Sequence, residues 1–260
     1  MPDVQGEDDL RRVAIDRVGV KDVTYPFTLR TKSGDTQTAT AKINMYVSLP
    51  HQKKGTHMSR FLEVLNEQTD GAVDPSDLPA IAREIKSRLQ ADHAYFEAEF
   101  TYFVKKHAPV TKQPGLMDYR VRFECVANST DDLIMSVAAP ATSLCPCSKE
   151  ISEYGAHNQR CLISASVRIA EGEHYWIEEL VGTLEAAASA PVYATLKRPD
   201  EKFVTEQAYD NPKFVEDIVR DLALGLEAED RVVWYSIDSE NFESIHSHNA
   251  YASITQDKRP

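Results

Sequence analysis

The order in which strands and helices are predicted is the feature that most constrains how this chain can fold. Residues 13–30 are rich in β-branched and aromatic side chains, which favours a strand. After a turn at residues 33–35, apolar and polar side chains alternate from Ala39 to Val47, which is the pattern of a strand with one buried face. These two segments are therefore predicted to form a β-hairpin.

Two helices and two strands are predicted after this hairpin. Residues 59–68 place apolar side chains at helical spacing, and a second helix begins near Asp74 with its own apolar stripe. Strands are predicted at residues 94–106 and 117–128. The first half of the chain thus has the predicted order ββααββ.

The same order, ββααββ, is predicted for the second half of the chain. Its strands are predicted at residues 133–142, 161–170, 231–242 and 244–255, and its helices at 175–188 and from Asn211 onward. Two such units imply an α+β fold, in which each unit has its own antiparallel sheet with helices on one face. The predicted division is a disordered arm at 1–10, a first module at 11–130 and a second module at 131–260.

The charge of the chain excludes some classes of partner. Its 29 basic and 41 acidic side chains give a formal net charge of −12, and an acidic surface repels nucleic acid and anionic lipid. No apolar run approaches the roughly 18 residues that span a bilayer, and we do not expect the acidic start to be a targeting segment. We therefore expect a cytoplasmic protein that binds neither nucleic acid nor membranes, with its four cysteines as thiols.

Two cysteines separated by one proline form the most unusual motif, Cys145-Pro146-Cys147. The spacing suits neither a zinc knuckle nor a redox-active CxxC pair, and Pro146 is expected to keep the segment extended. His157 follows after a short helix or turn, so a thiol and the imidazole form either a metal-binding pair or a Cys–His nucleophilic pair. The alternative, buried small side chains and a surface histidine, stays open.

Further candidate ligands and proton donors lie toward the end of the chain. Glu201, in a charged segment predicted as a loop at 197–206, would complete three protein ligands with an open fourth position, which is the catalytic arrangement. His246 and His248 are two residues apart on a predicted strand, so both face the same way and suit metal binding or proton transfer. A solvated connector and a polar edge strand are the alternatives.

One segment of this acidic chain is dense in basic side chains, namely His51, Lys53, Lys54, His57 and Arg60. It precedes and begins a predicted helix, so it is either a phosphate site or an ordinary solvated loop. In the late helix, Glu216 and Asp217 lie on opposite borders of the apolar face. Helical periodicity therefore does not decide which of these two carboxylates points into a site.

Together these motifs resemble the type IB GTP cyclohydrolases, a family of the tunnelling-fold superfamily. The resemblance rests on segments between about residue 47 and residue 251, in the family's order: LPHQKKGTHMSRF, SLCPCSKEIS with GAHNQR, KRPDEKFVTE, AYDNPKFVEDIVRD and SIHSHNAYA. It implies tandem ββααββ tunnelling-fold modules whose sheets pair between chains into barrels. It also implies a homotetramer with active sites at the subunit interfaces.

The resemblance also implies roles for individual residues. Cys145, His157 and Glu201 would bind one divalent metal ion, and Zn(II), Mn(II) and Fe(II) all suit such ligands. Glu216 would bind the guanine edge, and Cys147 would lie beside the metal as a catalytic residue, although an exchange of roles between the two cysteines stays open. The other implied residues are His246 and His248 for proton transfer, with His246 ranked first, and Lys54, His57, Arg60 and Lys202 for the triphosphate. No nucleotide cofactor is expected.

The implied activity is hydrolysis of GTP to 7,8-dihydroneopterin triphosphate and formate, the first step of folate biosynthesis. A metal-activated hydroxide would attack C8 of the guanine, and a histidine would protonate a ring nitrogen. Three alternatives stay open: an archaeal-type cyclohydrolase with a cyclic phosphate product, an NADPH-dependent nitrile reductase of the same superfamily, and a non-catalytic purine-binding protein.

Overall fold

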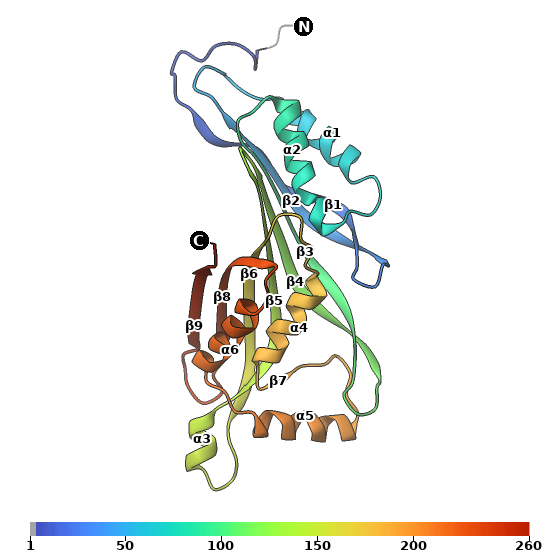
Figure 1. The fold of residues 1–260 in the computed structure, drawn as a ribbon, viewed down its shortest axis with the longest axis vertical. Coiled ribbons are helices and arrows are strands. Elements are labelled where there is room, and N and C mark those ends of the chain that lie inside the picture. The colour runs from blue at the N-terminus through green and yellow to red at the C-terminus, as the bar shows by residue number, and fades with distance from the viewer. Residues whose placement is uncertain (1–3, 260) are drawn as a thin grey trace. The chain divides into compact units, whose positions relative to one another are not determined.

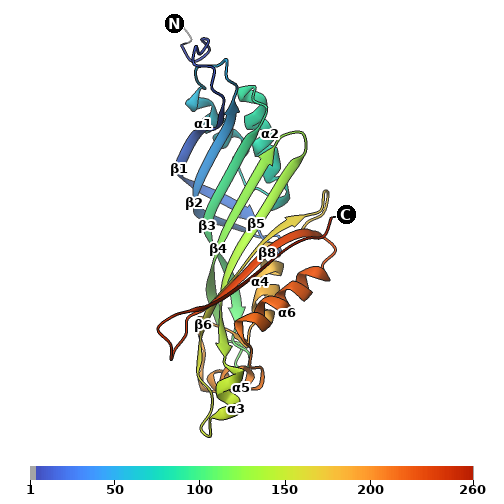
Figure 2. The same ribbon diagram turned by 90° about the vertical axis from the view of Figure 1, so that its left-hand side faces the viewer.

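A single sheet of nine strands runs through the computed structural model, which describes residues 4–259 (Figures 1 and 2). The strands are ordered β1-β2-β3-β4-β5-β6-β8-β9, and the short strand β7 pairs with β5. The chain divides into two compact units. Unit 1 comprises the described residues up to Thr101 with Arg122–Met135, and unit 2 comprises Tyr102–Val121 with the described residues from Ser136 onward.

Unit 1 is a sheet with two helices packed on it. Its elements are β1 (Ile15–Arg30), β2 (Thr36–Leu49), α1 (Met58–Gln68), the 3-10 helix η1 (Pro75–Asp77), α2 (Leu78–Leu89), and parts of β3 (Ala94–His107), β4 (Pro114–Ala127) and β5 (Asp131–Leu144). The predicted hairpin is confirmed, because β1 and β2 pair antiparallel with Phe27 opposite Ala39. The alternating apolar residues of β2 are buried, and so are Phe61 of α1 and Ile85 of α2. The alternation of apolar and polar residues in β2 therefore correctly predicted which face of the strand is buried under the helices.

Glycine is required at one point of this hairpin. A Cβ atom on Gly19 would lie 2.0 Å from the backbone oxygen of Met45, so there is no space for a side chain at this position. Close approach of two backbones is one of the reasons for glycine in a strand. A bulge between Val20 and Val23 follows, with Asp22 at a φ of 57°.

The segment predicted as a disordered arm covers residues 1–10, of which 1–3 lie outside the described residues. Residues 7–9 lie along residues 52–54. The N–H of Asp9 donates to the oxygen of Gln52 at 2.9 Å, and the N–H of Lys54 donates to the oxygen of Glu7 at 3.1 Å. Lys54 Nζ also lies 2.8 Å from Glu7 Oε2. This segment is therefore attached to the loop that precedes α1.

Unit 2 contains the remaining elements of the chain. They are α3 (Pro146–Ile151), β6 (Asn158–Ile169), α4 (Ile177–Ala187), β7 (Ala190–Pro191), α5 (Arg198–Asp210), α6 (Val215–Glu227), β8 (Val232–Asn241) and β9 (Ala250–Asp257). Helices α4 and α6 contact each other and lie on β6 and β8. Leu180, Leu184 and Leu222 are fully buried there, which is what their helical spacing predicts.

The predicted architecture of tandem ββααββ tunnelling-fold modules, each with its own sheet, is wrong. The chain forms one continuous sheet, and its second half contains α3, β7 and α5 in addition to the predicted elements. The cause is the connection between β4 and β5, which consists only of Asn128, Ser129 and Thr130. Asn128 Oδ1 accepts the N–H of Thr130 at 2.8 Å and closes an Asx turn. A turn this short makes β5 pair with β4, so the sheet continues.

Three local predictions are also wrong. Pro146 begins helix α3 rather than an extended segment, and residues 197–206 begin helix α5 rather than forming a loop. Proline is favoured in the first helical turn because its missing N–H has no partner there in any case. The strand predicted at 244–255 begins only at Ala250, because β8 ends at Asn241 and Asn241 pairs with Ala250. Residues 242–249 are therefore the loop of a hairpin.

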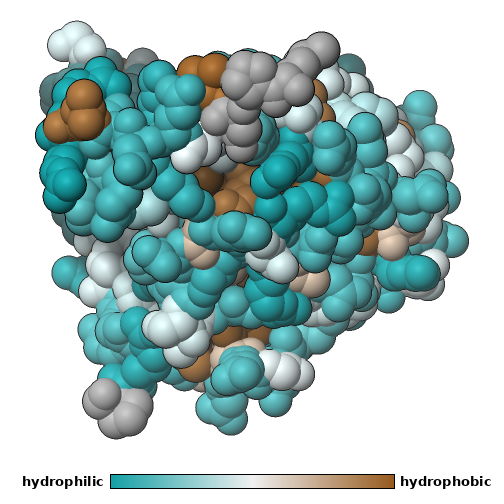
Figure 3. Space-filling view, turned by 90° about the horizontal axis from the view of Figure 1, so that it is seen from above, coloured by the Kyte–Doolittle hydropathy of each residue, from teal (hydrophilic) through white to brown (hydrophobic). Residues whose placement is uncertain are grey.

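The face shown in Figure 3 is mostly hydrophilic, with hydrophobic side chains in small separate areas. This agrees with the acidic composition of the chain. Within residues 4–259, none of the helices has both the length and the apolar character that crossing a membrane requires.

We expect the protein to lose stability as the pH rises above the ordinary thiol pKa of 9.0. Burial raises the pKa of the Cys161 thiol to about 12. Burial also raises the pKa of Tyr102 above its ordinary 10.0, and the hydrogen bond to Glu178 raises it further. In this pH range the folded protein keeps protons that the unfolded chain releases. The contribution of each group to the free energy of unfolding is therefore complete below the pKa that the group has in the unfolded chain. It decreases as the pH rises toward the pKa in the folded protein, by up to about 1.4 kcal/mol per pH unit for each group.

Urea unfolding at about pH 8 and about pH 10.5 measures this effect. Lys106 acts in the opposite direction, because burial lowers its pKa. A Cys161→Ala variant should show a shallower pH dependence than the wild type. An unfolding midpoint that is equal or higher at the alkaline pH would contradict the prediction.

Candidate active site

The ends of three strands meet at one end of unit 2. Strand β5 ends at Leu144, β6 begins at Asn158 and β8 ends at Asn241. The register of β6 and β8 places Cys161 opposite Asn241. The loops that leave these strands contain Cys145, His157 and residues 242–249, so the sheet brings separate parts of the sequence to one place.

Cys145 lies beside His157, whereas Cys147 is exposed. The N–H of Cys145 donates to the backbone oxygen of His157 at 3.1 Å. Cys145 is the N-cap of α3, where its Sγ accepts the N–H of Ser148 at 3.4 Å. Ser148 Oγ in turn accepts the N–H of His157 at 3.1 Å. Ser148 thus joins the first turn of α3 to His157, and of the two cysteines only Cys145 takes part in this arrangement.

The imidazole of His157 is held on its Nδ1 side, with the side chain only 14% exposed. Nδ1 lies 2.9 Å from Gln159 Oε1, 3.4 Å from Ser244 Oγ and 4.0 Å from Glu243 Oε2. Within residues 4–259, Nε2 makes no hydrogen bond. The nitrogen that could bind a metal ion or exchange a proton is therefore Nε2.

Glu243 is a site residue that the sequence analysis missed. Its Oε2 is buried and has no hydrogen-bond partner within the described part of the chain. A buried carboxylate oxygen without a hydrogen-bond partner is costly, so Glu243 Oε2 is a candidate for contact with a ligand. The available signal was that Glu243 directly precedes the motif that contains His246. The sequence analysis predicted strands on both sides of Glu243, so it did not predict the loop that brings this side chain to His157.

Glu201 and Lys202 lie on the exposed surface of α5. Glu201 Oε2 is 3.6 Å from Arg198 Nη1, and Lys202 Nζ is 3.0 Å from Glu206 Oε2. Among residues 4–259, no three His, Cys, Asp or Glu side chains are close enough together to hold a metal ion. The structure therefore brings Cys145 to His157 but does not bring Glu201 to the pair.

Helix α5 is nevertheless packed against the segment that contains the pair. Its Val204 and Ala208 contact a small apolar cluster with Leu144 and Ala156. Lys149 of α3 donates to the backbone oxygen of Tyr209 at 2.5 Å. Figure 1 shows α3 and α5 at the same end of unit 2.

Asp200 attaches the start of α5 to the turn between β3 and β4. It is fully buried and accepts the N–H groups of Val110, Thr111 and Lys197 at 2.8–2.9 Å, together with the Thr111 hydroxyl at 2.6 Å. Burial raises the pKa of Asp200, but these hydrogen bonds outweigh burial and hold it below its ordinary value. The anchored residue directly precedes Glu201, so it determines where Glu201 begins its helix.

The structure distinguishes Glu216 from Asp217. Asp217 Oδ2 accepts the N–H of Phe214 at 3.0 Å, so this side chain caps α6. Glu216 is exposed, and within residues 4–259 it has no hydrogen bond or ion pair. The N–H of Lys213 donates to the oxygen of Leu144 at 3.0 Å, which places the start of α6 next to the Cys145 segment. Glu216 is thus the carboxylate that is available to a ligand.

His246 and His248 are exposed on the loop between β8 and β9. Their rings are stacked, with centroids 5.2 Å apart and planes 12° apart. Ser244 of the same loop contacts His157. Both histidines are thus on the loop that closes over the Nδ1 side of His157.

The basic residues Lys54, His57 and Arg60 belong to unit 1, whereas the other candidate residues belong to unit 2. Lys54 pairs with Glu7, and Arg60 Nη1 lies 3.4 Å from the backbone oxygen of Arg88. His57 stands at the N-cap of α1 without a side-chain capping bond.

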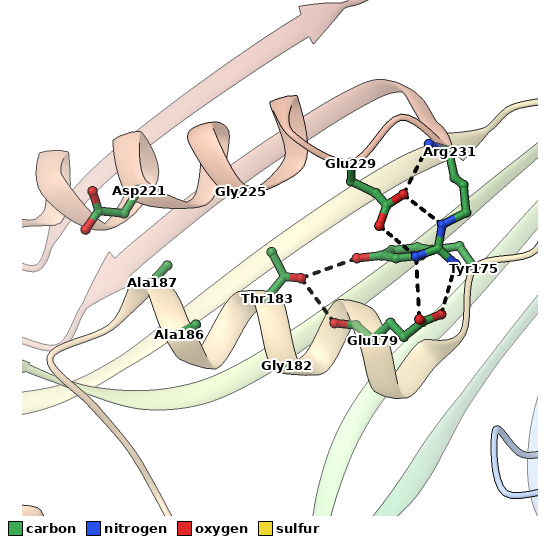
Figure 4. A pocket seen from close by; sticks show the side chains of 10 residues that line it. All are labelled: Tyr175, Glu179, Gly182, Thr183, Ala186, Ala187, Asp221, Gly225, Glu229 and Arg231. Carbon is green, nitrogen blue, oxygen red and sulfur yellow. Dashed lines mark hydrogen bonds and ion pairs between the residues drawn. The ribbon is translucent and has the colours of Figure 1, made fainter.

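A cavity of about 460 Å³ between α4 and α6 contains none of the predicted site residues (Figure 4). Arg231 lies in it over the ring of Tyr175 and forms ion pairs with Glu229 at 2.6 Å and Glu179 at 3.4 Å. The hydrogen bond from Arg231 lowers the pKa of Glu229. These contacts tie the end of α6 to α4, which is a structural role.

Comparison with known proteins identifies the relatives of this chain. The model of a family described as type I GTP cyclohydrolase folE2 matches residues 1–252. A GTP cyclohydrolase FolE2 of Magnetococcus marinus is 53% identical over 100% of this chain and 97% of its own length. One from Geobacter sulfurreducens is 52% identical over 100% of this chain and 99% of its own length.

Among solved structures, the chain is similar to uricases. The uricase from Arthrobacter globiformis has a TM-score of 0.55 and 9% identity, covering 93% of each chain. A uricase from Bacillus fastidious has a TM-score of 0.52 and 10% identity, covering 94% of each chain. At such low identity the likeness concerns the fold alone, and it agrees with the correction from tandem modules to one sheet.

The type IB identification made from the motifs is corrected by these findings. The matching family model and the similar relatives are described as folE2, and this description replaces it.

Proposed function

Because the chain belongs to the type I GTP cyclohydrolase folE2 family, we propose that it hydrolyses GTP to formate and 7,8-dihydroneopterin triphosphate at the start of folate biosynthesis. The main structural support is the adjacency of Cys145 and His157, with Nε2 of His157 facing away from the atoms that hold the ring. A thiol and an imidazole nitrogen are a suitable start for a catalytic metal site.

We propose that Cys145 Sγ and His157 Nε2 bind one divalent metal ion, with Glu201 as the third protein ligand. The pair fits a metal ion, but the third carboxylate is not beside it among residues 4–259. Binding therefore requires the start of α5 to approach the pair, or a second copy of the chain to supply the carboxylate. When bound, such an ion lowers the pKa of a coordinated water.

The side chains of this protein would then bind and protonate the substrate. Glu216 accepts two hydrogen bonds from the guanine edge, one from N1–H and one from the exocyclic amine. Addition of water to C8 is followed by cleavage of a C8–N bond, and His246 or His248 protonates the leaving ring nitrogen. A second hydrolysis releases C8 as formate. The exposure of Glu216 and of both histidines supports these roles, because each is accessible to a ligand.

We further propose that Lys54, His57, Arg60 and Lys202 bind the triphosphate. Three of them belong to unit 1 and Lys202 to unit 2. A homotetramer with sites between subunits, which the motifs suggested, would let one subunit complete the site of another. The local positive charge is also needed because the chain as a whole has a net charge of −12.

Formate release from GTP tests the proposal. We expect metal-free protein to release none, and protein supplied with Mn(II), Zn(II) or Fe(II) to release one formate for each GTP consumed. Phosphate analysis of the pterin product distinguishes a linear triphosphate from a cyclic phosphate. Folded protein that releases no formate with any of the three metals would overturn the proposal.

A further inference from the structure

A buried group of polar side chains lies beneath His157. Ser143 and Ser239 are fully buried, Asn241 is 2% exposed and Gln159 is 7% exposed. They come from the end of β5, the start of β6 and the end of β8. Buried polar side chains are retained only where they are hydrogen-bonded, so the direction of each hydrogen bond can be worked out.

The hydroxyl group of Ser143 determines the direction of the hydrogen bonds in this group. Its Oγ lies 3.1 Å from the backbone oxygen of Lys213, which can only accept, so the single hydroxyl hydrogen points there. The remaining neighbours of Ser143 Oγ must therefore donate. They are Asn241 Nδ2 at 3.0 Å and Gln159 Nε2 at 3.4 Å.

The hydrogen bond to Ser143 determines the orientation of the Gln159 side-chain amide, and this orientation determines which nitrogen of His157 bears the hydrogen. With Nε2 directed to Ser143, the carbonyl oxygen Oε1 of Gln159 faces His157 Nδ1 at 2.9 Å. A carbonyl oxygen only accepts, so Nδ1 must bear the hydrogen. The carboxylate of Glu243, 4.0 Å from Nδ1, favours the same arrangement, because a negative charge attracts the N–H dipole.

We propose that Gln159 is a positioning residue that, held by Ser143, keeps neutral His157 as the Nδ1–H tautomer and presents the lone pair of Nε2. The role of that lone pair in binding a metal ion rests on the proposed function, whereas the tautomer itself does not. Residues that orient a metal-binding histidine through its second nitrogen typically change metal affinity by about 10–100-fold when replaced.

The tautomer can be measured directly in metal-free protein. Long-range ¹H–¹⁵N correlation spectra at about pH 8.5, which is above the pKa of a free imidazole, should show His157 with its hydrogen on Nδ1, and a His157→Gln variant assigns the signals. In Gln159→Met the Nδ1–H form should lose its dominance. Ser143→Ala, a smaller change, should shift the population in the same direction. The matched control is Gln207→Met, the same substitution at an exposed position of α5.

Zinc affinity, measured by competition with a chelating dye, gives a second readout. Gln159→Met should weaken it by about 10–100-fold, and Gln207→Met should leave it unchanged. The inference is overturned if wild-type His157 has its hydrogen on Nε2, or if Gln159→Met changes neither tautomer nor affinity. Absence of formate release from a protein with the expected tautomer would overturn the proposed function instead.

Discussion

Replacing Cys145 with alanine is expected to lower metal-dependent formate release from GTP by more than about 100-fold, because loss of a direct ligand should exceed the 10–100-fold effect typical of its hydrogen-bond partners. Cys145 is the cysteine whose backbone bonds to His157, and it is partly buried. Cys147 is exposed in the first turn of α3. We therefore expect Cys147→Ala to retain the metal ion.

This pair of variants decides which thiol is the ligand, because the two residues differ only in position within one short motif. Bound zinc is measured after dialysis, and formate release is measured with excess metal ion. Circular dichroism verifies that both variants are folded. If Cys147→Ala loses the metal ion while Cys145→Ala keeps it, the assignment is reversed.

Lys106→Met is expected to lower the free energy of unfolding by about 3–5 kcal/mol, because it leaves a buried carboxylate without its cation. Lys106 of β3 lies 2.7 Å from both carboxylate oxygens of Glu185 on α4, and their side chains are only 16% and 13% exposed. Lys106 also donates to the backbone oxygen of Val192 at 2.8 Å, in the segment that leads to α5. Its loss should therefore loosen that segment as well.

Urea unfolding measures this loss, with Lys105→Met as the matched control. Lys105 is the exposed neighbour of Lys106, and its replacement should change stability by less than about 0.5 kcal/mol. Adding Glu185→Gln to Lys106→Met should restore much of the stability, because a neutral amide can keep the hydrogen bond from the Tyr119 hydroxyl, 2.7 Å long in the wild type. Equal stabilities of Lys106→Met and Lys105→Met would show that the pair contributes nothing.

Part of the candidate site was accessible from the sequence because its residues are close together along the chain. Cys145 and His157 are separated by one short helix and a turn, and the structure places them side by side. Glu243 was not predictable in this way. It reaches His157 only because β8 pairs with β6 in the register that puts Asn241 opposite Cys161. A pattern within one segment contains no information on which distant segment it will pair with.

The sequence by itself determined the hairpin of β1 and β2 and the apolar faces of α1, α2, α4 and α6. These depend on side-chain periodicity and residue identity over short stretches. Only the tertiary structure decided that β5 continues the sheet from β4, that Asp217 is used as a cap while Glu216 stays available, and that Gln159 faces His157. The physical reason is that strand neighbours and hydrogen-bond partners are chosen by contacts between residues far apart in the chain, where each buried polar group must find its partner.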